Sequence, residues 1–153
     1  MNRKVIPNLD FFTLVEQELD ETGSVLFIVQ GTSMQPMLRN GKDKVLLVKV
    51  GEKGLRPGDI CLFRHCGKHI LHRLIRRDGN DLYMRGDNVI GHCDICRPED
   101  VAGIVETVYR NERRLSPTSK KWKTITGIHR LTMKVKRPFA IIYHKLKGIL
   151  QHS

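Results

Sequence analysis

The chain has 153 residues, of which 40% are hydrophobic and 28% are charged, and its formal net charge is +11. This composition is typical of one globular domain with a substantial core, and it excludes a disordered chain or two full-sized domains. The charge is uneven: residues 1–109 balance 15 Lys and Arg against 15 Asp and Glu, whereas residues 110–153 carry 12 cationic side chains and the single acid Glu112.

The first predicted element is a helix over residues 9–21, where apolar side chains recur at near-helical spacing after a capping Asn8 or Asp10. Short apolar runs separated by turn residues come next, which is typical of an antiparallel, barrel-like or coiled β-sheet. The Asp78-Gly79-Asn80-Asp81 turn predicts a hairpin between two of them. The predicted strands span residues 25–29, 44–50, 59–64, 69–75, 82–85 and 101–109.

The character of the sequence changes after residue 110. Residues 111–126 are polar, basic and weakly patterned, so we expect a linker there. Pro138 then opens a predicted amphipathic helix, whose apolar residues at steps of three and four are Phe139, Ile142, Leu146, Ile149 and Leu150. The expected organisation is a mainly β domain over residues 1–109, with its motifs in 24–107, followed by a basic linker and C-terminal helix over 110–153.

The stretch Gly31-Thr32-Ser33-Met34-Gln35-Pro36 comes directly after the first predicted strand. Glycine accepts backbone angles that other residues avoid and proline stops a helix, so Ser33 is expected on a shaped turn at a strand end. A serine nucleophile needs that placement, with its oxygen exposed and backbone amides beside it. A simple strand-end turn would give the same pattern, so the motif gains meaning only from the motifs downstream of it in the chain.

Three such motifs occur in order: Pro57-Gly58-Asp59-Ile60, then His72-Arg73 inside an apolar run, then Gly86-Asp87-Asn88. Together with the Ser33 motif, they resemble the type I signal peptidase family over residues 24–107. That family shares a mostly β fold with the self-cleaving peptidases of the LexA-repressor type, so the resemblance implies a coiled β-sheet catalytic domain.

The resemblance also implies roles for individual residues. Ser33 would be the nucleophile and His72 the general base, as in the Ser-His branch of the family, because His72 stands where most bacterial members have lysine. An aspartate would orient the imidazole; Asp94 and Asp87 are nearly equal candidates, with Asp100 a more distant one. The oxyanion hole would use backbone amides near Ser33, with Gly31 and Thr32 beside it, because Gly31 replaces a hydroxyl found in some members. Met34 would pack beneath the site or line the substrate pocket.

The implied function is a serine endopeptidase that cleaves an extended precursor or leader peptide through a Ser33 acyl-enzyme, without a cofactor. Its rate should fall as the pH drops through the region near ~6.5, the ordinary pKa of histidine. The alternative is a catalytically silent or self-cleaving LexA-like domain that binds a peptide, a partner or a membrane.

The cysteines and the termini bear on location and metals. No run of 18 apolar residues occurs and the N-terminus lacks a signal-peptide pattern, so a cytoplasmic protein with reduced thiols is expected. A four-cysteine zinc site is the less favoured alternative, and it would use Cys61, Cys66, Cys93 and Cys96.

The basic residues of 110–153 indicate a binding partner other than a peptide substrate. An apolar stripe flanked by lysines over residues 137–150 suits peripheral contact with an anionic membrane surface. Docking onto the body of the same chain is the alternative. Nucleic acid ranks last, because few aromatic residues lie among the cations and no DNA-binding motif occurs.

Overall fold

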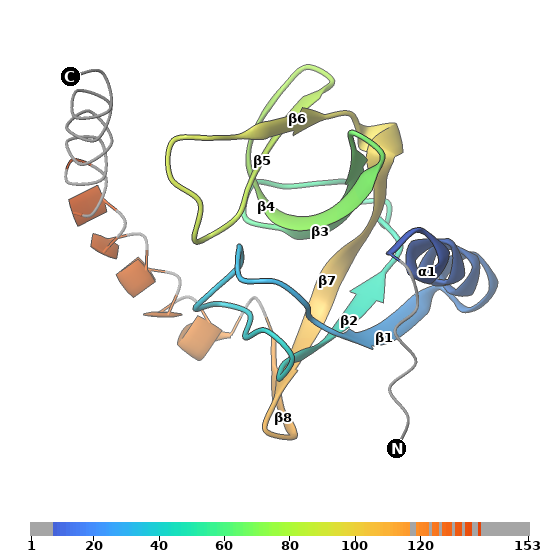
Figure 1. Ribbon diagram of the computed structural model, residues 1–153, viewed down its shortest axis with the longest axis horizontal. Coiled ribbons are helices and arrows are strands. Elements are labelled where there is room, and N and C mark those ends of the chain that lie inside the picture. Colours follow the sequence, from blue (N-terminus) through green and yellow to red (C-terminus); the bar gives the residue numbers. More distant parts are fainter. Residues whose placement is uncertain are drawn as a thin grey trace, which may run out of the picture.

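The computed structural model describes residues 8–116, 119–122, 124–125, 127–129, 131–132, 134–135 and 138. Within these residues, eight antiparallel strands form one sheet in the order β1-β2-β7-β3-β4-β5-β6, with β8 paired to β7. The sheet curls around its own core, and an N-terminal helix packs beside it (Figure 1). This arrangement confirms the expected mainly β fold.

Tight turns join several of the elements, whereas residues 29–43 and 49–59 form longer loops. The elements are α1 (Asn8–Thr22), β1 (Ser24–Ile28), β2 (Lys44–Val48), β3 (Ile60–His65), β4 (Lys68–Asp78), β5 (Asp81–Arg85), β6 (Asp94–Cys96), the 3-10 turn η1 (Pro98–Asp100), β7 (Val101–Arg110) and β8 (Arg113–Leu115).

The predicted helix and six predicted strands are confirmed within a few residues, and the predicted hairpin joins β4 to β5 through the pair Asp78 and Asp81. Strands β6 and β8 are not predicted, because three residues are too few to show an alternating pattern. Strand β4 is longer than expected and passes an irregularity between Leu74 and Arg76.

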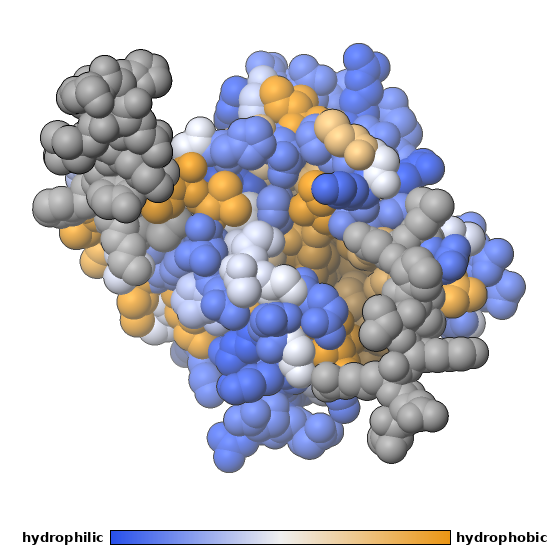
Figure 2. Space-filling model, in the orientation of Figure 1, coloured by the Kyte–Doolittle hydropathy of each residue, from blue (hydrophilic) through white to orange (hydrophobic). Residues whose placement is uncertain are grey.

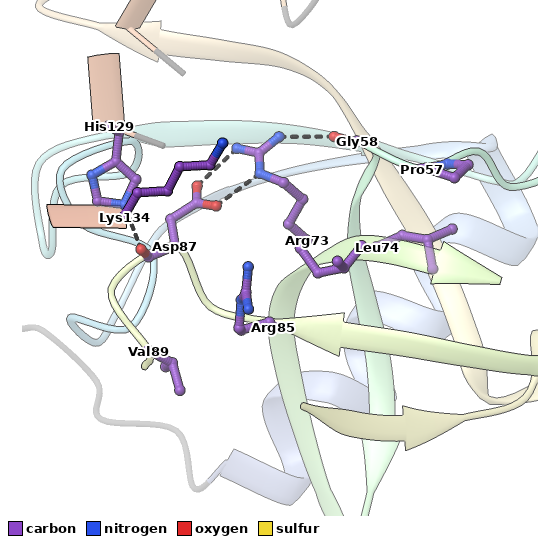
Figure 3. Close-up of a pocket in the computed structure, with 10 residues that line it drawn as sticks. Pro57, Gly58, Arg73, Leu74, Arg85, Asp87, Val89, His129 and Lys134 are labelled. Atoms are coloured by element: carbon purple, nitrogen blue, oxygen red, sulfur yellow. Dashed lines mark hydrogen bonds and ion pairs between the residues drawn. The ribbon is translucent and has the colours of Figure 1, made fainter. Parts of the chain in front are cut away.

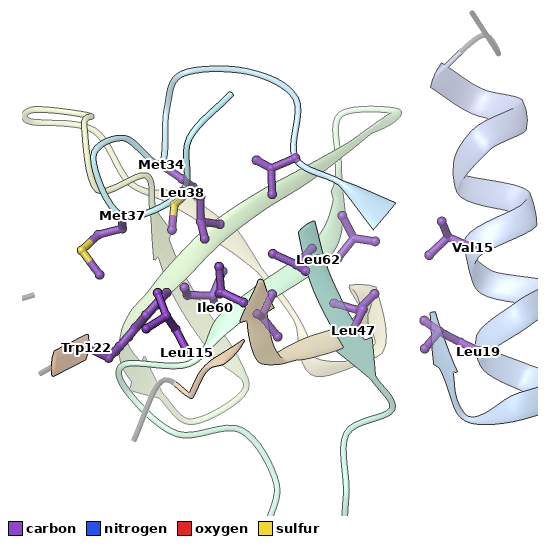
Figure 4. Packing of buried hydrophobic residues seen from close by; sticks show 14 residues of the cluster. Val15, Leu19, Met34, Met37, Leu38, Leu47, Ile60, Leu62, Leu115 and Trp122 are labelled. Atoms are coloured by element: carbon purple, nitrogen blue, oxygen red, sulfur yellow. The ribbon is translucent and has the colours of Figure 1, made fainter. Parts of the chain in front are cut away.

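The main core lies between α1, the long loop after β1 and the concave side of the sheet (Figure 4). Helix α1 contributes Val15 and Leu19, both 2% exposed. The loop contributes Met34, Met37 and Leu38. A second cluster around Phe63 and Met84 fills the space under β3 to β6.

The prediction of a linker over residues 111–126 is wrong for the residues that the structure describes there. This stretch contains β8 and helical residues, and it places Leu115 and Trp122 in the main core at 8% and 2% exposure. The helix predicted from Pro138 lies outside the described residues apart from Pro138 itself. Among the helices that the structure describes, none combines the length and apolar character needed to cross a bilayer.

Candidate active site

Ser33 lies on the loop between β1 and β2, and that loop is fixed by its own side chains. Met34, Met37 and Leu38 point into the core and are at most 3% exposed (Figure 4). Gly31 has a φ of +94°, a backbone conformation that would be strained in any residue with a side chain. Its N–H donates a hydrogen bond to Asn40 Oδ1 at 3.0 Å. The neighbouring Ser33 is therefore held half-buried on a rigid turn.

The far end of this loop is closed by a buried carboxylate. Asp43 is fully buried and accepts hydrogen bonds from Arg39 at 2.9 Å and from Arg110 at 2.7 Å. Burial alone would raise the pKa of Asp43, but these two guanidinium groups outweigh it and hold the pKa below its ordinary value of 3.8. Arg110 also donates to Met37 O at 2.7 Å, so β7 is tied directly to the Ser33 loop.

His72 lies in the middle of β4 and pairs with an acid from β6. Its Nδ1 is 3.0 Å from Asp94 Oδ2, and the two residues are 7% and 8% exposed. Asp94 reaches this position because β6 pairs with β5, where Asp94 is opposite Met84. A carboxylate at Nδ1 orients an imidazole and leaves Nε2 to exchange protons, which is the arrangement of a general base.

The turn after β5 brings Ser33 and His72 to one place. A Cβ placed on Gly86 would lie 2.6 Å from Ser33 O and 2.9 Å from His72 Nε2, so only glycine fits here. Asn88 N donates to Ser33 O at 2.8 Å and joins the two turns. No hydrogen bond joins Ser33 Oγ to His72 within the described residues; in serine peptidases this contact commonly tightens only with substrate.

Asp87, the other aspartate considered from the sequence, has a different partner. Arg73 donates from Nε and Nη2 to its two carboxylate oxygens, each at 2.8 Å, and from Nη1 to Gly58 O (Figure 3). Both side chains are nearly buried. The structure thus places Asp94 on His72 and Asp87 on Arg73, while Asp100 lies in η1.

Two more histidines surround Asp94, and the sequence gives no signal for them. His92 Nε2 is 3.1 Å from Asp94 Oδ1, and His65 Nε2 is 3.8 Å from the same oxygen. His92 comes from the loop before β6 with a side chain that is 71% exposed, whereas His65 ends β3. Only the folding of β3 against β4 and β6 brings these rings together.

Burial controls the titration of His72. It lowers the pKa of His72 below the ordinary 6.5 and outweighs the opposite effect of the Asp94 charge, while a charge on His92 lowers this pKa further. A base of this kind is neutral, and so able to accept a proton, at pH 6.5 and above.

A pocket of about 150 Å³ opens beside Ser33. Its walls come from the loop residues Val29, Gly31 and Met34 and from residues 69–71 of β4. Figure 2 shows an apolar-lined hollow on this face of the molecule. A larger pocket of about 450 Å³ lies on the Arg73–Asp87 side and is lined by neither Ser33 nor His72 (Figure 3).

The four cysteines do not form a cluster. Cys61 and Cys96 are buried, which raises the pKa of each thiol, that of Cys96 to about 11. Cys66 is exposed and Cys93 is half-buried. Within the part of the chain that the structure describes, no three His, Cys, Asp or Glu side chains are arranged to hold a metal ion.

A comparison with protein-family models agrees with the fold. The family model described as Peptidase S24-like matches residues 5–108, well over half of the chain, and the matched region includes Ser33, His72 and Asp94. A comparison with curated proteins finds no match. The chain belongs to the Peptidase S24-like family, within the superfamily that includes LexA and the type I signal peptidases.

Proposed function

We propose that this protein is a serine endopeptidase that uses Ser33 as nucleophile, His72 as general base and Asp94 as the group that orients His72. The observation that carries the proposal is the buried His72–Asp94 pair, whose free Nε2 lies against the turn bonded to Ser33. Membership of a peptidase family supports the same reaction class.

The reaction proceeds in two halves. Ser33 Oγ attacks the scissile carbonyl while His72 Nε2 takes its proton, and the resulting imidazolium is stabilised by Asp94. His72 returns this proton to the leaving amine, which departs and leaves the acyl-enzyme. A water molecule then attacks the ester with His72 again as base, and Ser33 recovers its proton from His72.

The developing oxyanion needs a hydrogen-bond donor near Ser33. Gly31 N–H already donates to Asn40, and Gln35 N–H donates to Thr32 O at 3.1 Å. Of the remaining N–H groups on this turn, we assign the oxyanion to that of Ser33, because it belongs to the proposed nucleophile itself. In this assignment Gly31 shapes the turn, and Met34 supports it from the core.

The substrate is proposed to bind as an added strand. The first half of β4, up to His72, pairs with β3 on one edge, whereas pairing with β5 begins only at Arg73. The other edge of this half therefore faces the pocket between β4 and the Ser33 loop. An extended peptide would bond to this edge and bring its carbonyl to Ser33, with small side chains nearest the cut because the pocket is small.

The test is active-site labelling with a fluorophosphonate probe, read by intact mass, followed by cleavage of a peptide library. We expect one probe on the wild-type chain, none on Ser33→Ala, and a labelling rate at least ~100-fold lower in His72→Ala, the range expected for loss of a general base. Ser24→Ala, at the start of β1, is the matched control and should label like the wild type.

Full labelling of Ser33→Ala would place the nucleophile elsewhere. Wild-type protein that is folded but neither labels nor cleaves any peptide would support the silent LexA-like binding module instead.

A further inference from the structure

The described helical residues between 120 and 135, called here the segment after β8, have two apolar faces, and the first one is packed against the domain. Trp122 is buried in the main core, and Ile125 packs against the same cluster. His129 Nε2 donates to Asp87 O in the turn that contacts Ser33 (Figure 3). These contacts attach the helical residues of this segment to the sheet and fix which of its side chains point outward.

The second face is exposed. Ile128, Leu131 and Val135 are 60%, 66% and 60% exposed, and all three residues are helical. Their spacing of three and four places them on one side of a helix, away from the side that carries Trp122 and Ile125. A helix that needed only to pack on its own domain would carry polar residues here.

The charge around this apolar face has one sign. Lys120 and Lys121 are exposed and, among the described residues, form no ion pair. Lys134 points instead toward the pocket that Arg73 and Asp87 line (Figure 3). The sequence has no acidic residue after Glu112, so the entire excess of +11 belongs to this end of the chain. On a helical projection Lys120 and Lys121 border the apolar face on its two sides, which is the pattern of a helix lying in a lipid interface.

We propose that the face made by Ile128, Leu131 and Val135, with Lys120 and Lys121 at its border, docks on an anionic membrane surface. The aliphatic side chains would enter the boundary between headgroups and acyl chains, while the lysines attract anionic headgroups. Nucleic acid would use the cations but would gain nothing from three exposed aliphatic residues, so a lipid surface fits better.

This docking would leave the proposed peptide groove accessible. Figure 1 shows the segment on the side of the sheet away from α1. The groove lies on the α1 side instead, because its lining residue His69 stacks on Phe12 of α1 with ring centroids 4.3 Å apart. The lipid face lies further toward the N-terminus than the 137–150 stretch that the sequence suggests, and it does not depend on peptidase activity.

The experiment is co-sedimentation of the full-length protein with vesicles of phosphatidylcholine alone and with vesicles containing about one third phosphatidylglycerol. We expect binding to the anionic vesicles to be at least ~10-fold tighter and to weaken with salt. The variant Ile128→Glu/Leu131→Glu/Val135→Glu should bind at least ~10-fold more weakly, because it loses apolar burial and gains repulsion. Val135→Glu alone should weaken binding in the same direction.

Leu14→Glu on α1 is the matched control, since Leu14 is 52% exposed on the opposite side and should bind like the wild type. Equal binding to both kinds of vesicle, or unchanged binding of the triple variant, would overturn the proposal. Loss of self-association in the triple variant, without any lipid binding by the wild type, would instead assign the face to a second copy of the chain. Competition of vesicle binding by DNA, with the triple variant unaffected, would assign it to nucleic acid.

Discussion

Asp94 is shared by imidazoles from β3, β4 and the loop before β6, and this crowding affects how the proposed base titrates. His72 is enclosed, whereas His92 is open to solvent and contacts the other carboxylate oxygen. The two rings therefore compete for one negative charge.

The pH profile depends on the burial of His72. Because burial lowers its pKa below 6.5, we expect the acid limb of kcat/KM, or of fluorophosphonate labelling, to fall below pH 6.5. The unfolded chain binds this proton more readily, so stability should also decrease as the pH falls from 6.5 through the pKa of His72. An acid limb centred above pH 7 would contradict the assignment of the base.

The variant His92→Gln should move the acid limb of the pH–rate profile to higher pH. A charged His92 lowers the pKa of His72, so its removal raises the pKa and the base is lost at a higher pH. The measurement is the labelling rate across pH, with Lys53→Gln as a control that removes a distant exposed charge. Identical profiles for wild type and His92→Gln would show that Asp94 is not shared in the active protein.

The variant Gly86→Ala should reduce activity by at least ~100-fold, since its Cβ would meet Ser33 O and His72 Nε2. Overpacking should also cost about 1–3 kcal/mol of stability. Gly51→Ala is the matched control, because a Cβ there meets no atom within 4 Å. Wild-type labelling by Gly86→Ala would mean that the two turns separate freely.

The sequence identified both aspartates near the candidate site but did not decide which of them pairs with His72. Asp87 and Asp94 both come after Gly86 in the chain, and spacing alone does not distinguish them. The choice depends on β6 folding back onto β5 and on Arg73 occupying Asp87 with a two-pronged hydrogen bond. Both contacts join residues far apart in the sequence, so the local sequence pattern does not reveal them.

At the scale of elements, the Ser33 loop depends on the buried Asp43. We expect Asp43→Asn to lower the free energy of unfolding by about 3 kcal/mol, because it removes the buried negative charge that pairs with the partly buried guanidinium groups of Arg39 and Arg110. Urea denaturation measures this loss. Asp20→Asn, which removes an exposed ion pair with Lys49, should change stability by less than about 1 kcal/mol.

The same carboxylate gives a second readout. The folded-state pKa of Asp43 lies below 3.8. Its contribution to the free energy of unfolding is therefore fully present above pH 3.8 and is lost as the pH falls from 3.8 through the folded-state pKa. The wild type should therefore lose stability in this range more steeply than Asp43→Asn. Parallel acid denaturation of the two proteins would contradict this role.

For the whole molecule, the core includes Leu115, Trp122 and Ile125, which come after the expected domain boundary. Trp122→Ala should destabilise the domain by about 3–5 kcal/mol, because it empties a site in the main core. Ile128→Ala, on the exposed face of the same segment, should change the free energy of unfolding by less than about 0.5 kcal/mol. Equal stability of Trp122→Ala and the wild type would restore the linker interpretation.

The boundary expected at residue 109 shows why the sequence does not reveal this packing. Trp122 stands between lysines, and its burial together with Ile125 depends on a cavity built by elements far away in the sequence. The long strands were predictable because each carries its own apolar run, whereas β8 and Trp122 acquire their positions only from the finished sheet.

The neighbours His72 and Arg73 point to opposite faces of β4, and each meets its own aspartate there. If β4 slipped by one residue against β5, the two side chains would exchange faces. The guanidinium would then compete for Asp94, and the imidazole would face the space beside Asp87. The alternation of these two hydrogen-bonded pairs thus specifies the register of the strand, and a misaligned sheet would bury a mismatched charge at its centre.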